Sequence, residues 1–534
     1  MKRYFKITAL VFSFAVIVAS CEDSFLEEEV RSAYTPENLT DALGFEAALV
    51  GLYQQMGAYQ GLSWAQGWLA VWQVGTDIVW PTLPQGIEVP YYEYSSLTAD
   101  DQATTYTWEW NYNLIENANS IINNVENPEL QAPDMNEEDR NRVNAEARFF
   151  RAYAYNMLAT LYGGVPLVTE ALTEPRTDFV RAPIEDINAL IEEDLNFATE
   201  HLPEVGGMPA EARINKYAAH QLFAEFYLRT DEPAKAEEEA DAIIESSAYS
   251  LVTERYGVKA DEDGDPFSDM FWKGNQRRSQ GNTEAIWVLE MENPADVRGG
   301  SVGAPQHRRV WGAQYHSRAG MLPADSLGGR GLSRIRLNNF VLYDLYDQGD
   351  MRNSEYNINR ELYYNNPDYE DYGERVPYEG PDTLFITNPY TMKWKHFDER
   401  DTFGWGMWKD FILMRLGETY LLKAEAQFKQ DDFAGAASSI NELRERANAP
   451  MVDAGDIDLD FILDERVREL IAEENRRMTL MRTGTLVERA NRLNNDAPEN
   501  MQIRGLSETH LLMPIPLREI QLNKDAELEQ NPGY

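Results

Sequence analysis

The chain has 534 residues, of which 90 are acidic and 48 are basic, so its formal net charge is -42. This excess of negative charge disfavours nucleic acids and anionic lipid surfaces as partners. The hydrophobic content of 43% and the mean hydropathy of -0.52 predict a soluble globular body for the part that follows the N-terminal segment.

Residues 1–20 match the pattern of a lipoprotein signal peptide. Lys2, Arg3 and Lys6 supply positive charge, residues 7–19 are almost all apolar, and small residues precede Cys21. The apolar run is too short to span a bilayer, which needs about 20 residues in a helix. Cys21 is the only cysteine and cannot form an internal disulfide, so we predict that it is lipidated. An ordinary cleaved secretory signal is the alternative.

The segment after Cys21 is predicted to be a lipidated acidic tether, residues 21–40, because five acidic residues stand ahead of Pro36. Helical patterns follow. The first helix is predicted to begin near Asp41. Apolar residues spaced three and four apart predict another helix over 141–162, which two glycines end. Residues 213–246 are predicted to form a helical hairpin.

A further hairpin is predicted from Phe411 to Pro450. Its Leu416-Gly417-x-x-Tyr420 matches the tetratricopeptide repeat, in which small residues let two antiparallel helices approach closely. The alanine that the repeat expects stands at Ala436, seven residues late, which predicts about two extra helical turns. A last helical stretch is predicted over 464–492, before a proline-rich end.

The middle of the chain has a different character. Between about 251 and 410 it contains scattered Gly, Pro, Asn and Tyr, with short strand-like runs such as Ala285–Leu289. The predicted fold is therefore mostly α, with tetratricopeptide-like helical repeats at about 41–250 and 411–492. The large irregular, loop-rich insertion between them is the predicted ligand site, because loops on a rigid scaffold usually carry binding sites.

Sequence signatures of enzymes are missing. The chain has no H-E-x-x-H, no G-x-S-x-G, no phosphate-binding glycine loop and no cysteine pair. We therefore predict a protein that is not an enzyme and that uses no cofactor. An undetected hydrolase is one competing hypothesis, and it would release reducing sugars on prolonged incubation.

Aromatic residues are the informative class, since flat rings stack on the apolar faces of sugars. Trp64, Trp68 and Trp72 recur every four residues, which predicts a buried helical stripe. Other rings fall in predicted loops, where each either anchors its loop or forms a platform for a ligand. The candidate ligand-binding residues are Asp77, Trp80, Tyr91, Trp272, Arg308, Trp311 and Tyr315.

Residues 271–343 carry ten basic and five acidic residues, so this segment is positive within an acidic chain. These cations either pair with acids elsewhere or form a site for carboxylated or sulfated ligands, which suit the planar donors of arginine. Asp261, Asp263 and Asp265 resemble part of a calcium loop, although Gly264 falls at its fourth position rather than its sixth. No other metal site is predicted.

Five separated segments resemble those of one family, SusD/RagB, which comprises outer-membrane lipoproteins of Bacteroidota. They include Tyr162-Gly163-Gly164-Val165-Pro166 and the C-terminal Gln530-Asn531-Pro532-Gly533-Tyr534. The other segments are residues 146–155, 282–286 and 415–426.

The resemblance implies a single SusD-like domain at 41–534, anchored by its lipid to the outer membrane and facing the cell exterior. Members capture oligosaccharides or polysaccharides and deliver them to a SusC-like, TonB-dependent transporter. Ligand residues vary between members, so none is carried over by motif. Two alternatives are a peptide-binding import subunit of the same family and a binder of an anionic polysaccharide through residues 271–343.

Overall fold

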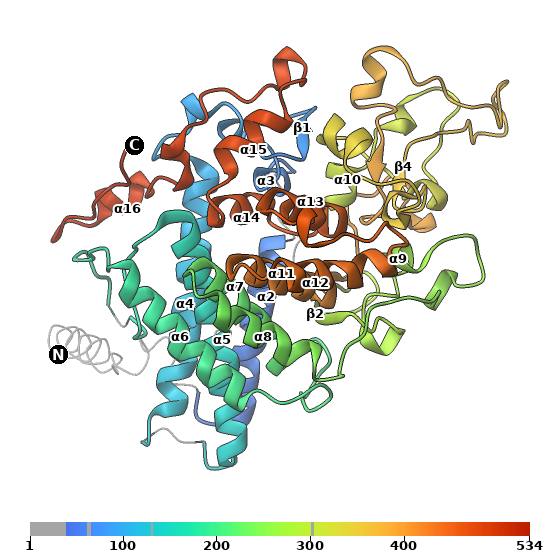
Figure 1. Ribbon diagram of the computed structural model, residues 1–534. Helices are drawn as coiled ribbons and strands as arrows, with labels where there is room; N and C mark the ends of the chain where they lie inside the picture. Colours follow the sequence, from blue (N-terminus) through green and yellow to red (C-terminus); the bar gives the residue numbers. More distant parts are fainter. Residues whose placement is uncertain (1–38, 61–65, 130–131, 173, 299, 301–303) are drawn as a thin grey trace, which may run out of the picture.

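The computed structural model describes residues 39–60, 66–129, 132–172, 174–298, 300 and 304–534 (Figure 1). The predicted signal peptide, Cys21 and nearly all of the predicted tether lie outside these residues, as does Trp64. Within the described ranges, no helix is both long enough and apolar enough to cross a membrane.

Six long helices make up the first half. They are α2 (Ala42–Gln60), α4 (Gln102–Glu126), α5 (Glu137–Tyr162), α6 (Ile184–His201), α7 (Lys216–Arg229) and α8 (Pro233–Ile244). Helix α5 packs against both α4 and α6, and α7 packs against α8. This confirms the predicted helices near residue 41, over 141–162 and in the 213–246 hairpin.

Local chemistry sets the ends of α5. The Asn136 side chain accepts a hydrogen bond from the Asp139 amide, and three acidic residues in the first turn favour the positive end of the helix dipole. At the other end Gly163 adopts φ 75°, a conformation that costs little without a side chain.

The second half contains five further helices. They are α11 (Leu416–Lys429), α12 (Phe433–Arg446), α13 (Leu459–Leu470), α14 (Arg476–Arg482) and α15 (Leu486–Leu493). The stretch predicted as one helical unit over 464–492 is therefore divided into three helices. A short helix α16 (Leu517–Leu522) follows the proline-rich segment.

The prediction of extra turns in the late hairpin was wrong. Helices α11 and α12 have 14 residues each. Strand β6 (Phe411–Arg415) runs directly into α11, so Gly417 lies in the first turn of the helix rather than near its middle. The late position of Ala436 therefore reflects where the helix begins, and not how long it is.

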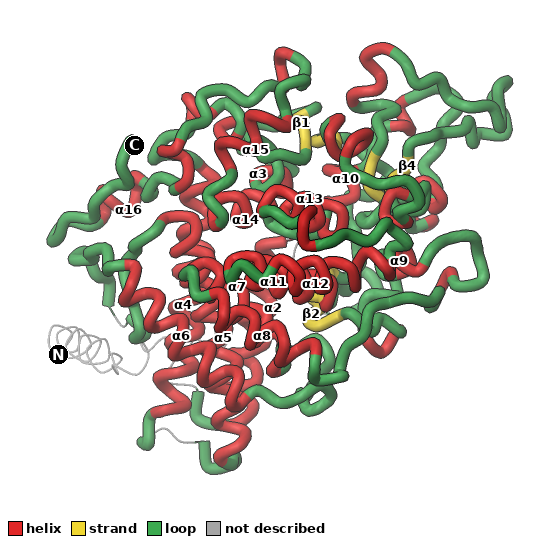
Figure 2. The backbone as a smooth tube through the Cα atoms, viewed as in Figure 1, coloured by secondary structure: helices red, strands yellow, loops and turns green. Residues whose placement is uncertain are grey.

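The loop-rich insertion leaves and rejoins one helical stack. Helix α11 packs against α8 as well as α12, so the helices on either side of the insertion touch directly. At the entrance, β2 (Ala285–Leu289) pairs antiparallel with β6 and confirms the strand predicted at 285–289. Figure 2 shows that most of the insertion between them consists of loops.

Two more antiparallel pairs stabilise the insertion. Strand β1 (Val79–Pro81) pairs with β3 (Ile335–Leu337), and β4 (Ile358–Asn359) pairs with β5 (Tyr390–Thr391). Its short helices are α9 (Pro266–Asp269) and α10 (His307–Trp311), and α3 (Trp68–Val71) lies ahead of β1. The predicted class, a mostly helical fold with short strands, is confirmed.

Candidate functional site

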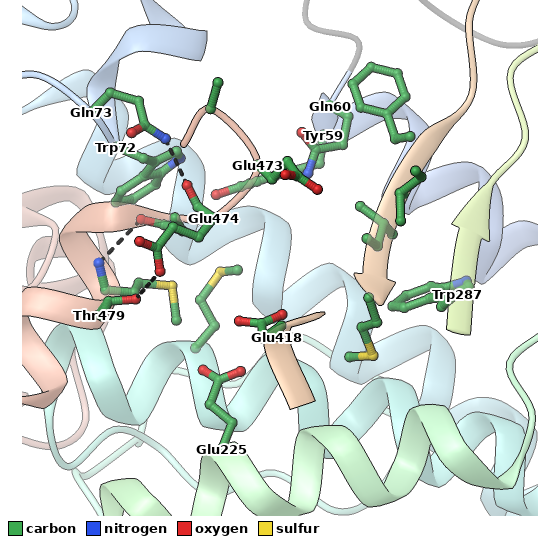
Figure 3. A pocket seen from close by; sticks show the side chains of 18 of the residues that line it. Tyr59, Gln60, Trp72, Gln73, Glu225, Trp287, Glu418, Glu473, Glu474 and Thr479 are labelled. Carbon is green, nitrogen blue, oxygen red and sulfur yellow. Dashed lines mark hydrogen bonds between the residues drawn. The ribbon is translucent and has the colours of Figure 1, made fainter. Parts of the chain in front are cut away.

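An internal cavity of about 200 Å³ lies among α5, α7, α11 and α14, beside β2 and β6 (Figure 3). Tryptophan rings and four glutamates line it, the latter being Glu225, Glu418, Glu473 and Glu474. Ligand pockets commonly measure about 300–1,000 Å³. This hollow is partly open to solvent, and at this volume it is too small for an oligosaccharide.

Most of the acids around the cavity are already paired. Glu418 and Glu474 both accept hydrogen bonds from the Arg466 guanidinium, at 2.8 Å each. Glu473 accepts from Arg415 at 2.8 Å. Glu225 differs, because its carboxylate has no hydrogen bond or ion pair to any described residue, and Figure 3 shows it near Glu418.

Six of the seven predicted ligand residues are buried, and for Asp77, Trp80, Tyr91 and Tyr315 the burial corrects the assignment. Trp80 is 3% exposed and lies in β1, where Arg336 stacks on its ring at 4.7 Å. The Tyr91 hydroxyl donates to Asp101 at 2.7 Å, and the Tyr315 hydroxyl donates to the Gly329 carbonyl at 2.6 Å. Each ring anchors its segment to the core and has no face free for a ligand.

Asp77 is the fourth buried residue, and its partners are cationic. Its carboxylate accepts hydrogen bonds from Arg476 at 2.6 and 2.8 Å and from Arg489 at 2.8 Å. Burial opposes ionisation, but the two guanidinium groups outweigh it and lower the pKa of Asp77 to about 2. Asp77 therefore joins distant elements and is not available to bind a ligand.

The three remaining predicted residues belong to the insertion, and only Trp272 is partly exposed. Trp272 is half-buried, with the Lys395 ammonium 3.6 Å from its ring centre. Trp311 is buried at the end of α10 and lines the internal cavity. Arg308, from the same short helix, donates to the carbonyls of His396 and Gly404 at 2.7 and 2.9 Å. Only Arg308 lies beside the exposed rings described below.

The calcium candidates do not converge. Asp261 and Asp263 are exposed, whereas Asp265 is buried and accepts hydrogen bonds from the Ser268 amide at 2.7 Å and the Ser354 hydroxyl at 2.6 Å. Asp265 thus caps α9. Over the described part of the chain, no group of three or more His, Cys, Asp or Glu side chains is placed to hold a metal ion.

Four arginines gather around helix α10 of the insertion, and we call Arg308, Arg309, Arg330 and Arg334 the arginine cluster. Helix α10 carries the first two. The Arg334 amide donates to the Val310 carbonyl at 2.9 Å, which places the segment before β3 alongside α10. Helix α10 and the segment before β3 thus bring two arginines each into one cluster.

Two exposed aromatic rings border the arginine cluster. The Trp405 side chain is 65% exposed and its ring centre lies 5.8 Å from the Arg309 guanidinium carbon. Phe403 is 55% exposed and lies 5.8 Å from the corresponding carbon of Arg330. The sequence predictions missed both rings. Trp405 stands between Gly404 and Gly406, a signal of an exposed loop that could have identified it.

A second hollow lies on the opposite side of the view in Figure 1, between α4, residues 166–179 and α16. Its volume is about 760 Å³, within the usual range for ligands. Apolar side chains such as Tyr112, Leu172 and Phe179 share its wall with Arg176 and Arg518. We call it the α16 groove.

Comparisons with known proteins identify the class. A family model described as the SusD family matches residues 334–534, and another described as "Starch-binding associating with outer membrane" matches residues 53–228. The chain belongs to the SusD/RagB family.

Individual relatives span nearly the whole chain. SusD-like protein P25 of Formosa agariphila is 27% identical over 94% of each chain. Starch-binding protein SusD of Bacteroides thetaiotaomicron is 26% identical over 76% of this chain and 75% of its own. A solved SusD homolog from Bacteroides thetaiotaomicron shares the fold, with a TM-score of 0.72 at 19% identity over 95% of this chain and all of its own. A solved laminarin-binding SusD-like protein has a TM-score of 0.69 at 22% identity, over 93% of this chain and all of its own.

Proposed function

We propose that this protein binds glycan chains at the cell surface and passes them to a SusC-like, TonB-dependent transporter. Family membership supports the proposal, as do the relatives named as starch-binding or laminarin-binding proteins. The description of the matched family model, which mentions the outer membrane, supports the proposed location. A lipid on Cys21 would hold the protein there, facing the exterior.

The observation that carries the proposal is the pair of exposed rings, Trp405 and Phe403, beside the arginine cluster. Exposed aromatic rings offer flat apolar faces for sugar rings, and guanidinium groups donate hydrogen bonds to hydroxyl groups. Neither ring is needed to fill the core, since more than half of each side chain is exposed. Binding and release require no reacting group, so the proposal is of a binding protein and not of an enzyme.

The test is a binding assay on the double variant Trp405→Ala/Phe403→Ala, using a panel of algal and plant polysaccharides in affinity electrophoresis and calorimetry. Loss of two stacking contacts, each worth about 1 kcal/mol, should weaken binding at least about tenfold. Tyr372→Ala is the matched control, because Tyr372 is an exposed ring of the same insertion and lies outside the cluster. It should bind as the wild type does.

If the double variant bound glycans as the wild type does, the glycan site would not include Trp405 and Phe403. The α16 groove would then be tested first. A wild-type protein that binds peptides and no glycan would replace the proposal with a peptide-import role. Both outcomes are read from the same panel once peptides are included.

A further inference from the structure

The arginine cluster lacks acidic partners in a chain that has an excess of acids. No ion pair joins Arg308, Arg309, Arg330 or Arg334 to any acid among the described residues. Arginines elsewhere do form such pairs. Arg277 lies 2.7 Å from Asp410, and Arg352 lies 2.8 Å from Glu465. Asp401 and Glu88 act on Arg308 and Arg334 through their charges, but neither acid forms an ion pair with the cluster.

Neutral groups hold the cluster in place. Arg308 and Arg330 donate to backbone carbonyls of the loop that carries the exposed rings, including Phe403 at 2.7 Å. Arg309 and Arg334 donate to the side-chain oxygens of Gln306 and Gln66, at 2.6 and 2.7 Å. These bonds orient the guanidinium groups without pairing any of them directly with an acid.

The cluster retains unused donors. The Nε atoms of Arg308, Arg309 and Arg330 are buried and have no hydrogen-bond partner. Arg308 and Arg309 are themselves 5% and 8% exposed. A buried donor without a partner costs about 1–3 kcal/mol, and more when it is charged, so these arginines favour negative charge nearby. The Nε atoms are closed to solvent, and a ligand would contact the partly exposed Arg330 and Arg334.

The arginines also disfavour one another. Burial first, and then the charges of Arg330, Arg334 and Arg308, lower the pKa of Arg309 to about 10. Burial and the neighbouring charges of Arg330 and Arg309 lower the pKa of His316 to about 4, so this imidazole is neutral at pH 7. An anion at this position would relieve the repulsion.

We propose that the arginine cluster binds the carboxylate or sulfate groups of an acidic glycan, while Trp405 and Phe403 stack on its sugar rings. The inference rests on the proposed glycan-binding function and names the chemical class of the glycan. The planar guanidinium fork matches both groups. The acidic remainder of the chain does not prevent this, because charges beyond about 8 Å are largely screened at 0.15 M salt.

The experiment compares three probes by calorimetry on the full chain: alginate as a polyuronate, carrageenan as a sulfated galactan, and laminarin as a neutral glucan. The variant is Arg309→Gln/Arg330→Gln. We expect it to bind the acidic probe at least tenfold more weakly than the wild type. Arg375→Gln is the control, because Arg375 is an exposed arginine of the same insertion that pairs with Glu361 at 2.8 Å. It should change nothing.

The salt dependence of probe binding is a second test, and it uses only the wild-type protein, so it does not depend on whether a variant folds. Binding of the acidic probe to the wild type should weaken severalfold between 50 and 500 mM NaCl. Binding to alginate alone or to carrageenan alone supports the inference and identifies the acidic group. Tight, salt-independent binding of laminarin together with weak binding of both acidic probes would overturn the inference and leave the proposed function standing. If the protein bound none of the three probes and no other glycan, both the inference and the proposed function would be overturned.

Discussion

Glu225 is a carboxyl group at the edge of the cavity that has no hydrogen bond or ion pair to any described residue, although the charges of Arg482 and Arg466 act on it. Burial, and then the nearby charge of Glu418, raise its pKa above the ordinary value. A carboxyl whose pKa is higher in the folded state than in the unfolded state adds stability when the pH is below its unfolded-state pKa. That contribution is lost as the pH rises through the folded-state pKa.

We predict that Glu225→Gln is more stable than the wild type at pH 8, by about 1–3 kcal/mol, because the neutral amide avoids burying an unpaired charge. The advantage should shrink toward pH 4, where the wild-type carboxyl is protonated. Urea unfolding of both proteins between pH 4 and pH 8 measures it. A constant difference over this range would show that Glu225 does not titrate in the cavity.

At the scale of single residues, sequence alone could not separate anchors from platforms. Trp80 and Trp405 both stand near glycine or proline in segments without helical periodicity. Trp80 is buried because β1 pairs with β3, whose residues lie more than 250 positions later in the chain. Trp405 has no such partner strand. Long-range strand pairing therefore decided which of the two tryptophans is exposed, and the residues next to each of them do not reveal that pairing.

At the scale of elements, Asp77 joins segments that are distant in sequence. It follows α3, while its partners Arg476 and Arg489 lie in α14 and α15. All three side chains are almost completely buried. A buried ion pair tolerates the loss of one partner poorly, because the other charge is then left without compensation in a medium of low polarity.

Asp77→Asn should therefore lower the free energy of unfolding by about 2–3 kcal/mol at pH 7, because Arg476 keeps Glu474 and Arg489 keeps Asp464 as partners. The folded-state pKa of about 2 lies below the ordinary value of 3.8, so this stabilisation is present above pH 3.8 and is lost as the pH falls toward 2. Denaturant unfolding at pH 7 and pH 3 measures both effects.

Asp178→Asn is the control, since Asp178 pairs with Arg176 on the surface, where both side chains are about half exposed. Exposed pairs contribute about 0–1 kcal/mol, so this variant should be nearly as stable as the wild type. Equal stability of the Asp77 variant and the control would contradict the structural role of Asp77.

The elements themselves were predictable to different degrees. Helix α5 and the α7–α8 hairpin follow from local periodicity, and β2 from a run of apolar residues between polar ones. Strands β1, β4 and β5 have only two or three residues each. Such strands are too short for a periodic signal and form only where a distant partner supplies hydrogen bonds.

At the scale of the whole molecule, α8 packs directly against α11, so the helical scaffold is continuous across the point where the insertion leaves and rejoins it. The insertion can therefore carry the arginine cluster while the helical stack stays continuous. Figure 1 shows α10 and α16 at opposite sides of the view, so the arginine cluster and the α16 groove lie far apart. One surface can bind a glycan while the other is free for a different contact.

The proposed lipid anchor sets how far this surface can reach from the membrane. Lipidation at Cys21 would leave about 20 residues before α2 begins at Ala42, a chain that spans at most about 70 Å when fully extended.

We predict that the wild type incorporates labelled palmitate, sediments with outer membranes and is degraded by protease added to intact cells. Cys21→Ala should incorporate no label, because no other cysteine can accept the thioether. The Trp405→Ala/Phe403→Ala variant is the matched control and should be labelled and located as the wild type is. Wild-type protein that is unlabelled and free in the soluble fraction would instead indicate an ordinary secretory signal, and capture of glycans at the membrane would then need another tether.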